Sequence, residues 1–263
     1  MSDPILLRDD QGPVTVLTMN RPAALNALSD ALLAALADQF AALAGTPSCR
    51  VIILKGAGRA FCAGHDLKEM QAGRAAPDQG RGYFADLFGR CAALMLAIRA
   101  HPPPVIAEVH GIATAAGCQL VATCDLAVAA TGTRFGVNGV NIGLFCSTPM
   151  VALSRNVPAK RAFEMLTTGH FITHEGATEA GLINRAVAPE SLAAEALTLA
   201  QTIAAKLAAA VKIGKRAFYE QLEMGIAEAY THTAAVMVEN MLWRDTEEGI
   251  TAFLEKRKPD WPT

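Results

Sequence analysis

Residues 51–70 read VIILKGAGRAFCAGHDLKEM, a strand pattern followed by a glycine turn and the start of a helix. The apolar run VIILK (51–55) is rich in β-branched residues and ends at glycine, as expected of a buried strand. After the turn comes the small-residue corner Gly64-His65-Asp66, in which Asp66 is of a residue type that caps helix N-termini. One interpretation is an ordinary capped turn. The other is a corner that presents a backbone N–H group to a ligand.

A second corner with the same layout lies at residues 110–125, HGIATAAGCQLVATCD. It follows the apolar run VIAEV (105–109) and leads into a helical pattern, so N–H groups near Ala115, Ala116 and Gly117 are unpaired at a helix start. Two such corners after neighbouring strands can direct two N–H donors at one oxygen, as in an oxyanion hole. Two ordinary strand-to-helix turns would give the same spacing. Neither corner is a P-loop, because the lysine and hydroxyl residue that should follow are missing.

Strand-like and helical patterns alternate along the first two thirds of the chain. Ser29 and Asp30 open an amphipathic helix that ends at Gly45, and a second helical pattern, 83–100, stops at the prolines of 102–104. Alternation of this kind predicts the α/β class. Strand patterns occupy residues 14–19, 51–55, 105–109 and 125–130.

From residue 190 onward the pattern changes to helix after helix with no strand between them. We therefore predict two parts, an α/β core over residues 1–189 and a helical oligomerisation region over residues 190–263. The apolar faces of the second part are suited to packing on a neighbouring subunit.

Composition limits the partners that this chain can bind. The formal net charge of the 263 residues is −2, which argues against nucleic acid or an anionic membrane held by bulk charge. No apolar run approaches the roughly 20 residues of a membrane span. The N-terminus, MSDPILLRDD, has neither a signal-peptide nor a transit-peptide pattern, so a cytoplasmic location is expected. The six cysteines form no C-x-x-C pair, which predicts reduced, packed thiols and no metal site.

Six stretches of the chain, taken together and in order, resemble the crotonase superfamily, the enoyl-CoA hydratase/isomerase family. They are NRPAALNALS (20–29), GAGRAFCAGHDLKEM (56–70), VHGIATAAGCQLVATCD (109–125), TRFGVNGVNIGL (133–144), ITHEGATEAGLINRAV (172–187) and GITAFLEKRKP (249–259). The resemblance implies a spiral of β-β-α turns with a C-terminal helical trimerisation region. It also implies an acyl-CoA thioester substrate, no cofactor beyond the coenzyme A of that substrate, and a homotrimer or a dimer of trimers.

The resemblance also assigns site residues. The N–H groups of His65 and Ala116 would polarise the thioester carbonyl, and Gly64 would let the substrate approach. Phe253 and Lys256 match positions that contact the nucleotide end of coenzyme A, often on a neighbouring subunit. The CoA groove maps onto Ala23, Ala24, Leu25, Ala27, Ala63, Asp66 and Leu67, and the remaining substrate-contacting positions map onto Gly117, Gln119, Gly139, Asn141 and Gly143.

Two positions depart from the family pattern. The glutamates that hold the attacking water in hydratases map onto Gln119 and Gly139, and no acidic residue lies between Asp125 and Glu164. Acid–base catalysis is worth about 10²–10⁴-fold, so the standard hydratase mechanism has lost a main contribution. If the backbone follows the family, changing both positions to glutamate should raise hydration.

Three functional readings stay open. The first is a hydratase or isomerase with an unusual or weak acid–base set. The second is a decarboxylase-type lyase that acts through the enolate alone, with His65 and Asn141 orienting a carboxylate. The third is a CoA-thioester binder or oligomeric scaffold without catalysis.

Overall fold

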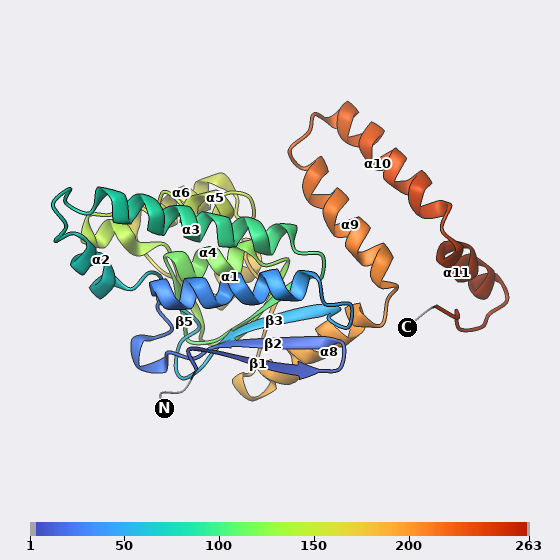
Figure 1. Ribbon diagram of the computed structural model, residues 1–263, viewed down its shortest axis with the longest axis horizontal. Helices are drawn as coiled ribbons and strands as arrows, with labels where there is room; N and C mark the ends of the chain where they lie inside the picture. The colour runs from blue at the N-terminus through green and yellow to red at the C-terminus, as the bar shows by residue number, and fades with distance from the viewer. Residues whose placement is uncertain (1–3, 262–263) are drawn as a thin grey trace. The chain divides into compact units, whose positions relative to one another are not determined.

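The structure is a computed structural model that describes residues 4–261. It divides into two compact units, Met1–Gln201 and Thr202–Thr263, which are described separately below. The first unit is a mixed α/β body and the second is helical (Figure 1), so the predicted α/β class with a helical C-terminal region is confirmed. The predicted border at residues 189 and 190, as the edge of an oligomerisation region, stays a prediction.

The main sheet of the first unit has six strands in the order β1-β2-β3-β4-β6-β9. Only β1 runs antiparallel to its neighbour β2; the other pairs are parallel. Every residue of β4 is buried, which explains why its sequence is a continuous apolar run rather than an alternating one. The strands are β1 (Leu6–Gln11), β2 (Val14–Met19), β3 (Val51–Gly56), β4 (Val105–Val109), β6 (Leu126–Ala130) and β9 (Arg185–Val187).

A second sheet of three short strands accompanies the first. Its order is β5 (Ile112–Thr114), β7 (Arg134–Gly136) and β8 (Ile172–Thr173), with β5 and β7 parallel. The chain passes from a long strand in one sheet to a short strand in the other and then into a helix, as in β4, β5 and α4 (Ala116–Thr123). This strand-strand-helix step is the repeat of the predicted spiral.

Helices α1 (Asp30–Ala44) and α3 (Arg81–Ala100) lie side by side (Figure 1). Ser29 caps α1 as predicted, because its side chain accepts a hydrogen bond from the Leu32 N–H. Both helices bury one apolar face in the core. The other helical segments of this unit are η1 (Pro22–Ala24), α2 (Leu67–Gly73), η2 (Asn138–Ile142), α5 (Pro149–Leu153), α6 (Ala159–Thr168), α7 (His174–Glu179), η3 (Pro189–Ser191) and α8 (Leu192–Ala204), the last of which ends in the second unit.

The second unit continues with α9 (Ala208–Gln221), α10 (Ile226–Met241) and α11 (Arg244–Leu254). Helix α9 packs on α10, and α10 on α11. Among residues 4–261 no single helix has both the length and the apolar character of a membrane span, although the bent pair Pro189–Ala204 and Ala208–Gln221 has them jointly.

The loop between β2 and α1 is held by Asn26, whose side chain is fully buried. Its Oδ1 accepts a hydrogen bond from the Arg21 N–H at 2.9 Å, and its Nδ2 donates to the carbonyls of Ala57 and Ala60 at 2.8 Å. The loop is therefore fastened to the turn that follows β3.

Replacing Asn26 with alanine should lower the free energy of unfolding by about 3 kcal/mol, because three hydrogen bonds are lost and their partners stay in the protein unsatisfied. Urea unfolding measures this change. Asn20→Ala is the control, since Asn20 makes one exposed bond to the carbonyl of Pro4, and it should cost less than about 1 kcal/mol. Equal losses in the two variants would contradict the anchoring role.

Candidate active site

The segment that follows β3 runs beside the short strand β5. The Cys62 N–H donates to the carbonyl of Ile112 at 3.2 Å, and the Thr114 N–H donates to the carbonyl of Cys62 at 3.0 Å. The Phe61 N–H is likewise bonded to the carbonyl of His110 at 3.0 Å. These bonds bring the Gly64 corner next to the start of α4.

The two corners then touch through small residues. A Cβ atom on Gly64 would lie 2.9 Å from the Cβ of Ala115 and 3.4 Å from the amide nitrogen of Ala116, and Gly64 has φ +92°. A Cβ on Gly117 would overlap the carbonyl oxygen of Cys62. Glycine is therefore required at both positions, by space at Gly117 and by space and conformation at Gly64.

Two backbone amides at this junction are unpaired within the described residues. The Leu28 N–H donates to the carbonyl of Gly64 at 2.7 Å and the Asp66 N–H to the carbonyl of Leu28 at 3.1 Å, so the N–H of the intervening His65 faces away from this bridge. Ala116 is the first residue of α4, where the N–H has no acceptor inside the helix. The structure thus brings the two predicted donors, His65 and Ala116, to adjoining corners.

The imidazole of His65 also lacks a hydrogen bond of good geometry, although the nearby Leu28 backbone favours its protonated form. Both ring nitrogens are buried and make no hydrogen bond in the part of the chain that the structure describes. The ring meets Phe88 edge-on, with centroids 5.7 Å apart. Burial lowers the pKa of His65, so the ring is neutral at pH 7. A buried imidazole without hydrogen bonds needs a physical explanation, and a bound ligand that supplies the missing hydrogen bonds is such an explanation.

The predicted CoA groove follows the loop that Asn26 anchors. The Ala63 N–H donates to the carbonyl of Leu25 at 3.0 Å, which lines up the loop with the first corner. The guanidinium of Arg21 contacts the carbonyl of Ala27 and pairs with the carboxylate of Asp66 at 2.9 Å. Ala23 and Leu67 are exposed, Ala24 and Ala63 are half-buried, and all four lie on this strip of chain.

Asp66 has the capping role that the sequence predicted. Its side chain accepts a hydrogen bond from the Lys68 N–H at 3.1 Å as the N-cap of α2. Burial alone would raise the pKa of Asp66, but the hydrogen bonds from Arg21 and Lys68 outweigh it and lower the pKa. The carboxylate is therefore charged at neutral pH, and the stability that it contributes is lost only as the pH falls through this lowered value.

The positions that replace the family's two glutamates are both buried. Gln119 lies in α4 with its Oε1 4.0 Å from the Sγ of Cys91. Gly139 lies in η2, where a Cβ would overlap the carbonyl oxygen of Leu144 and approach the Sγ of Cys146 to 2.9 Å. A side chain at Gly139 would require the backbone at Leu144 to move, which argues against a gain in hydration from glutamates at both positions; that gain stays a prediction. The obstacle is space rather than a positive φ.

Two other predicted residues make no hydrogen bond to either corner among the described residues. Asn141 is exposed, and its Nδ2 donates to the carbonyl of Gly169 at 3.5 Å. Gly143 is exposed and ends η2 with φ +77°. The structure gives no support to an orienting role for Asn141.

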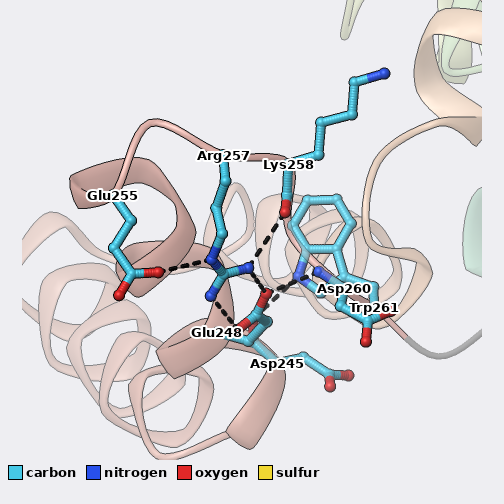
Figure 2. A network of polar contacts seen from close by, with 7 residues as sticks. All are labelled: Asp245, Glu248, Glu255, Arg257, Lys258, Asp260 and Trp261. Carbon is cyan, nitrogen blue, oxygen red and sulfur yellow. Dashed lines mark hydrogen bonds and ion pairs between the residues drawn. The ribbon is translucent and has the colours of Figure 1, made fainter.

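The turn after α11 in the second unit is held by Arg257 (Figure 2). Its guanidinium meets both carboxylate oxygens of Glu248, at 2.6 and 3.0 Å, and also pairs with Glu255 at 2.6 Å. The hydrogen bond from Arg257 lowers the pKa of Glu248 to about 2. The Asp260 N–H donates to the same Glu248 at 2.8 Å, which folds the chain end back onto α11.

Phe253 and Lys256, the predicted nucleotide contacts, lie at this turn. Phe253 is 82% exposed, and Lys256 follows the helix end with φ +57°. The network around Arg257 therefore fixes the backbone on either side of Lys256.

All six cysteines are free and buried, as predicted. Burial raises the pKa of Cys62 and Cys118 to about 12 and that of Cys91 to about 11, and it also raises the pKa of Cys146. None of these four thiols has the lowered pKa of a nucleophile. Residues 4–261 contain no group of three or more histidine, cysteine or acidic side chains that could hold a metal ion.

Sequence reasoning missed the anchoring roles of Arg21 and Asn26 and the backbone conformation of Ala115. The stretch NRPAALN contains three polar side chains, those of Asn20, Arg21 and Asn26, beside small residues, a pattern that could have indicated an anchored loop. Nothing in the sequence indicated the conformation of Ala115, which has φ 49° and ψ −119°.

Comparison with known proteins assigns the family. The family model described as enoyl-CoA hydratase/isomerase matches residues 9–263. Human enoyl-CoA hydratase domain-containing protein 3, mitochondrial, is 46% identical over 245 residues, covering 93% of this chain and 79% of that protein. The stretches AGHDLKEM (63–70) and GVNIGLFCSTPMVAL (139–153) predicted a resemblance to the same group, and this prediction is confirmed.

Solved structures agree with this assignment. The crystal structure of an enoyl-CoA hydratase from Mycobacterium smegmatis superposes with a TM-score of 0.95 at 55% identity, covering 99% of this chain and 100% of that chain. The crystal structure of human enoyl-CoA hydratase domain-containing protein 3 gives a TM-score of 0.93 at 44% identity, covering 98% and 100% of the two chains. The predicted crotonase fold is thereby confirmed.

The same relatives correct the expected location. Five relatives at 41–46% identity, from human, mouse, rat, Xenopus laevis and Danio rerio, are named as mitochondrial proteins. The cytoplasmic location expected from the N-terminal composition is contradicted. By fold, motifs and similarity over nearly its whole length, this chain belongs to the enoyl-CoA hydratase/isomerase family of the crotonase superfamily.

Proposed function

We propose that this protein binds an acyl-CoA thioester and stabilises its enolate between the N–H groups of His65 and Ala116. The observation that carries the proposal is the pair of unpaired amides at adjoining corners. Donors fixed before the reaction stabilise developing oxyanion charge, and removal of one such donor typically costs about 10²–10³-fold in rate. The enolate carries that charge, whereas the thioester carries only part of it.

The nominal reaction is hydration or isomerisation of an enoyl-CoA, and we propose that hydration is weak. Water addition needs a group that activates the water and a group that supplies the α-proton. Gln119 and Gly139 provide no carboxylate. A glutamine amide in the buried surroundings of α4 orients a substrate or a water molecule but does not take a proton at neutral pH.

One observation favours a second candidate, a decarboxylase-type lyase. The buried ring nitrogens of His65 have no hydrogen-bond partner, and they belong to the residue whose amide is one of the two unpaired donors. A neutral imidazole with a free N–H can donate a hydrogen bond to a substrate carboxylate. Loss of CO₂ produces the enolate directly, so this reaction needs the oxyanion hole and no base.

Solvent deuterium tests these assignments. The protein is incubated in D₂O with butyryl-CoA, crotonyl-CoA and, separately, methylmalonyl-CoA, and deuterium at the acyl α-carbon is measured by mass spectrometry together with 3-hydroxyacyl-CoA and CO₂. Enolate stabilisation predicts slow hydration together with α-deuterium in butyryl-CoA, with solvent hydroxide taking the α-proton and D₂O returning a deuteron to the enolate. Release of CO₂ from methylmalonyl-CoA, lost in His65→Ala while thioester binding is retained, would select the lyase. Absence of α-deuterium from all three thioesters would contradict both and leave a CoA-thioester binder.

We also propose a homotrimer or a dimer of trimers. The second unit exposes large apolar side chains, including Ile226 at 79%, Leu242 at 81% and Phe253 at 82% exposure. Its buried apolar residues are mainly small, so its own folding leaves much apolar surface in water. Apolar patches of this kind are typical of subunit interfaces.

Light scattering should therefore give three or six times the single-chain mass of 27.7 kDa. Replacing Leu242 with glutamate should reduce that mass, because burying a charge in an apolar interface is costly. The control Leu96→Glu changes an apolar residue of the first unit that is 65% exposed and should leave the mass unchanged. A wild-type mass near 27.7 kDa would contradict the assembly.

The lack of space for a side chain at Gly139 can be tested by measuring the stability of a variant. Gly139→Ala should lower the free energy of unfolding by roughly 2 kcal/mol, because the added methyl group overlaps backbone that cannot move freely. Gly89→Ala in α3, where a Cβ would meet nothing within 4 Å, should raise it by up to about 1 kcal/mol. The melting temperatures of the two variants should change in opposite directions. An unchanged melting temperature for Gly139→Ala would contradict the prediction, because it would show that the backbone of η2 moves to make room for the methyl group.

A further inference from the structure

Ala115, the residue directly before α4, has a backbone conformation that only glycine adopts without strain. Its φ of 49° and ψ of −119° are close to the first central position of a type II′ turn. Leu25 also has positive φ, but its ψ of 36° places it in the ordinary left-handed region that some side chains tolerate. Strain of this kind persists only where the surrounding structure imposes it, and it concentrates at functional sites.

Three contacts impose the conformation on Ala115. Its N–H donates to the carbonyl of Gly136 at 2.9 Å, and its carbonyl accepts from the Gln119 N–H at 3.0 Å. Its methyl group faces the first corner, where a Cβ on Gly64 would lie only 2.9 Å away. The residue is thus held by the short sheet, by α4 and by the opposite corner.

The conformation of Ala115 sets the direction of the Ala116 N–H. The peptide group between the two residues is planar and trans, so its N–H points opposite to its C=O. Because the carbonyl of Ala115 accepts the first hydrogen bond of α4, the N–H of Ala116 points out of the N-terminal end of that helix. Rotation about ψ of Ala115 would turn both groups together.

We propose that Ala115 is a positioning residue whose strained backbone, held by the contact of its methyl group with Gly64, presets the Ala116 N–H for the oxyanion. The proposal rests on the proposed function, since it concerns the same pair of amides. Alanine restricts the rotation of this peptide group, whereas glycine in the same place would let it move. The strained backbone at Ala115 thereby gives the Ala116 N–H group a fixed direction.

Ala115→Gly tests the proposal. The melting temperature should stay equal to that of the wild type or rise, because glycine has no strain at these angles. The rate of α-deuterium incorporation into butyryl-CoA should nevertheless fall by about tenfold or more, since small misplacement of a catalytic group has large effects on rate. The KM should change little, because the donor contact is stronger with the enolate than with the thioester. The carbonyl stretch of bound crotonyl-CoA, measured by Raman difference spectroscopy, should shift less than in the wild type.

Ala34→Gly is the matched control, the same chemical change at an exposed position inside α1. It should lower the melting temperature by a few degrees, as glycine in a helix interior does, and leave the exchange rate and the Raman shift unchanged.

Two results would overturn the inference while leaving the proposed function in place. In the first, the wild type incorporates α-deuterium and shifts the carbonyl stretch of bound crotonyl-CoA, and the Ala115→Gly variant does both equally well. The other is an Ala115→Gly variant that melts lower, as Ala34→Gly does, because alanine would then be unstrained there. A wild type that binds crotonyl-CoA with neither exchange nor a band shift would refute the proposed function itself, and the inference would fall with it.

Discussion

The backbone pairing of Cys62 with β5 is the constraint on which the arrangement of the site depends. Two hydrogen bonds, from Cys62 to Ile112 and from Thr114 to Cys62, tie the segment after β3 to the segment after β4. Neither segment is fixed there by the main sheet, because both have already left it. Once they are paired, the Gly64 corner and the start of α4 lie in contact, and only glycine fits where their backbones approach, at Gly64 and Gly117. The side chain of Asn26 then ties the loop between β2 and α1 to the same segment, through its hydrogen bonds to the carbonyls of Ala57 and Ala60.

The long parallel strands and the main helices could be predicted from the sequence because burial and periodicity are visible there. β4 is buried along its whole length and therefore appears as an uninterrupted apolar run, and α1 shows its cap and its apolar face. β1 was missed for the opposite reason. It is an exposed edge strand with the sequence LLRDDQ, so it has neither alternation nor an apolar run. The strands β5, β7, β8 and β9 are too short, at two or three residues, to show any period.

The candidate site also has some features that could be predicted from the sequence and others that could not. The order of strand, glycine turn and helix start predicted two corners with exposed N–H groups and a cap at Asp66, and the family resemblance assigned the two donors to His65 and Ala116. The lack of space for a side chain at Gly139 could not be predicted. It is caused by the carbonyl of Leu144, whose position depends on the fold of the chain after η2. The orphaned ring of His65 and the backbone angles of Ala115 also depend on tertiary packing, which no local pattern encodes. The relatives corrected the location because N-terminal composition is a weak guide to compartment.

The buried thiols near the two corners have a chemical consequence for the proposed binding of a thioester. An acyl-CoA can in principle pass its acyl group to a cysteine by thiol exchange, and the attacking species is the thiolate. Because burial raises the pKa of Cys62 and Cys118 to about 12, these thiols are protonated at pH 7. Dry packing thus suppresses self-acylation at the place where a reactive acyl group would be held, so these cysteines can lie beside the corners without consuming the substrate.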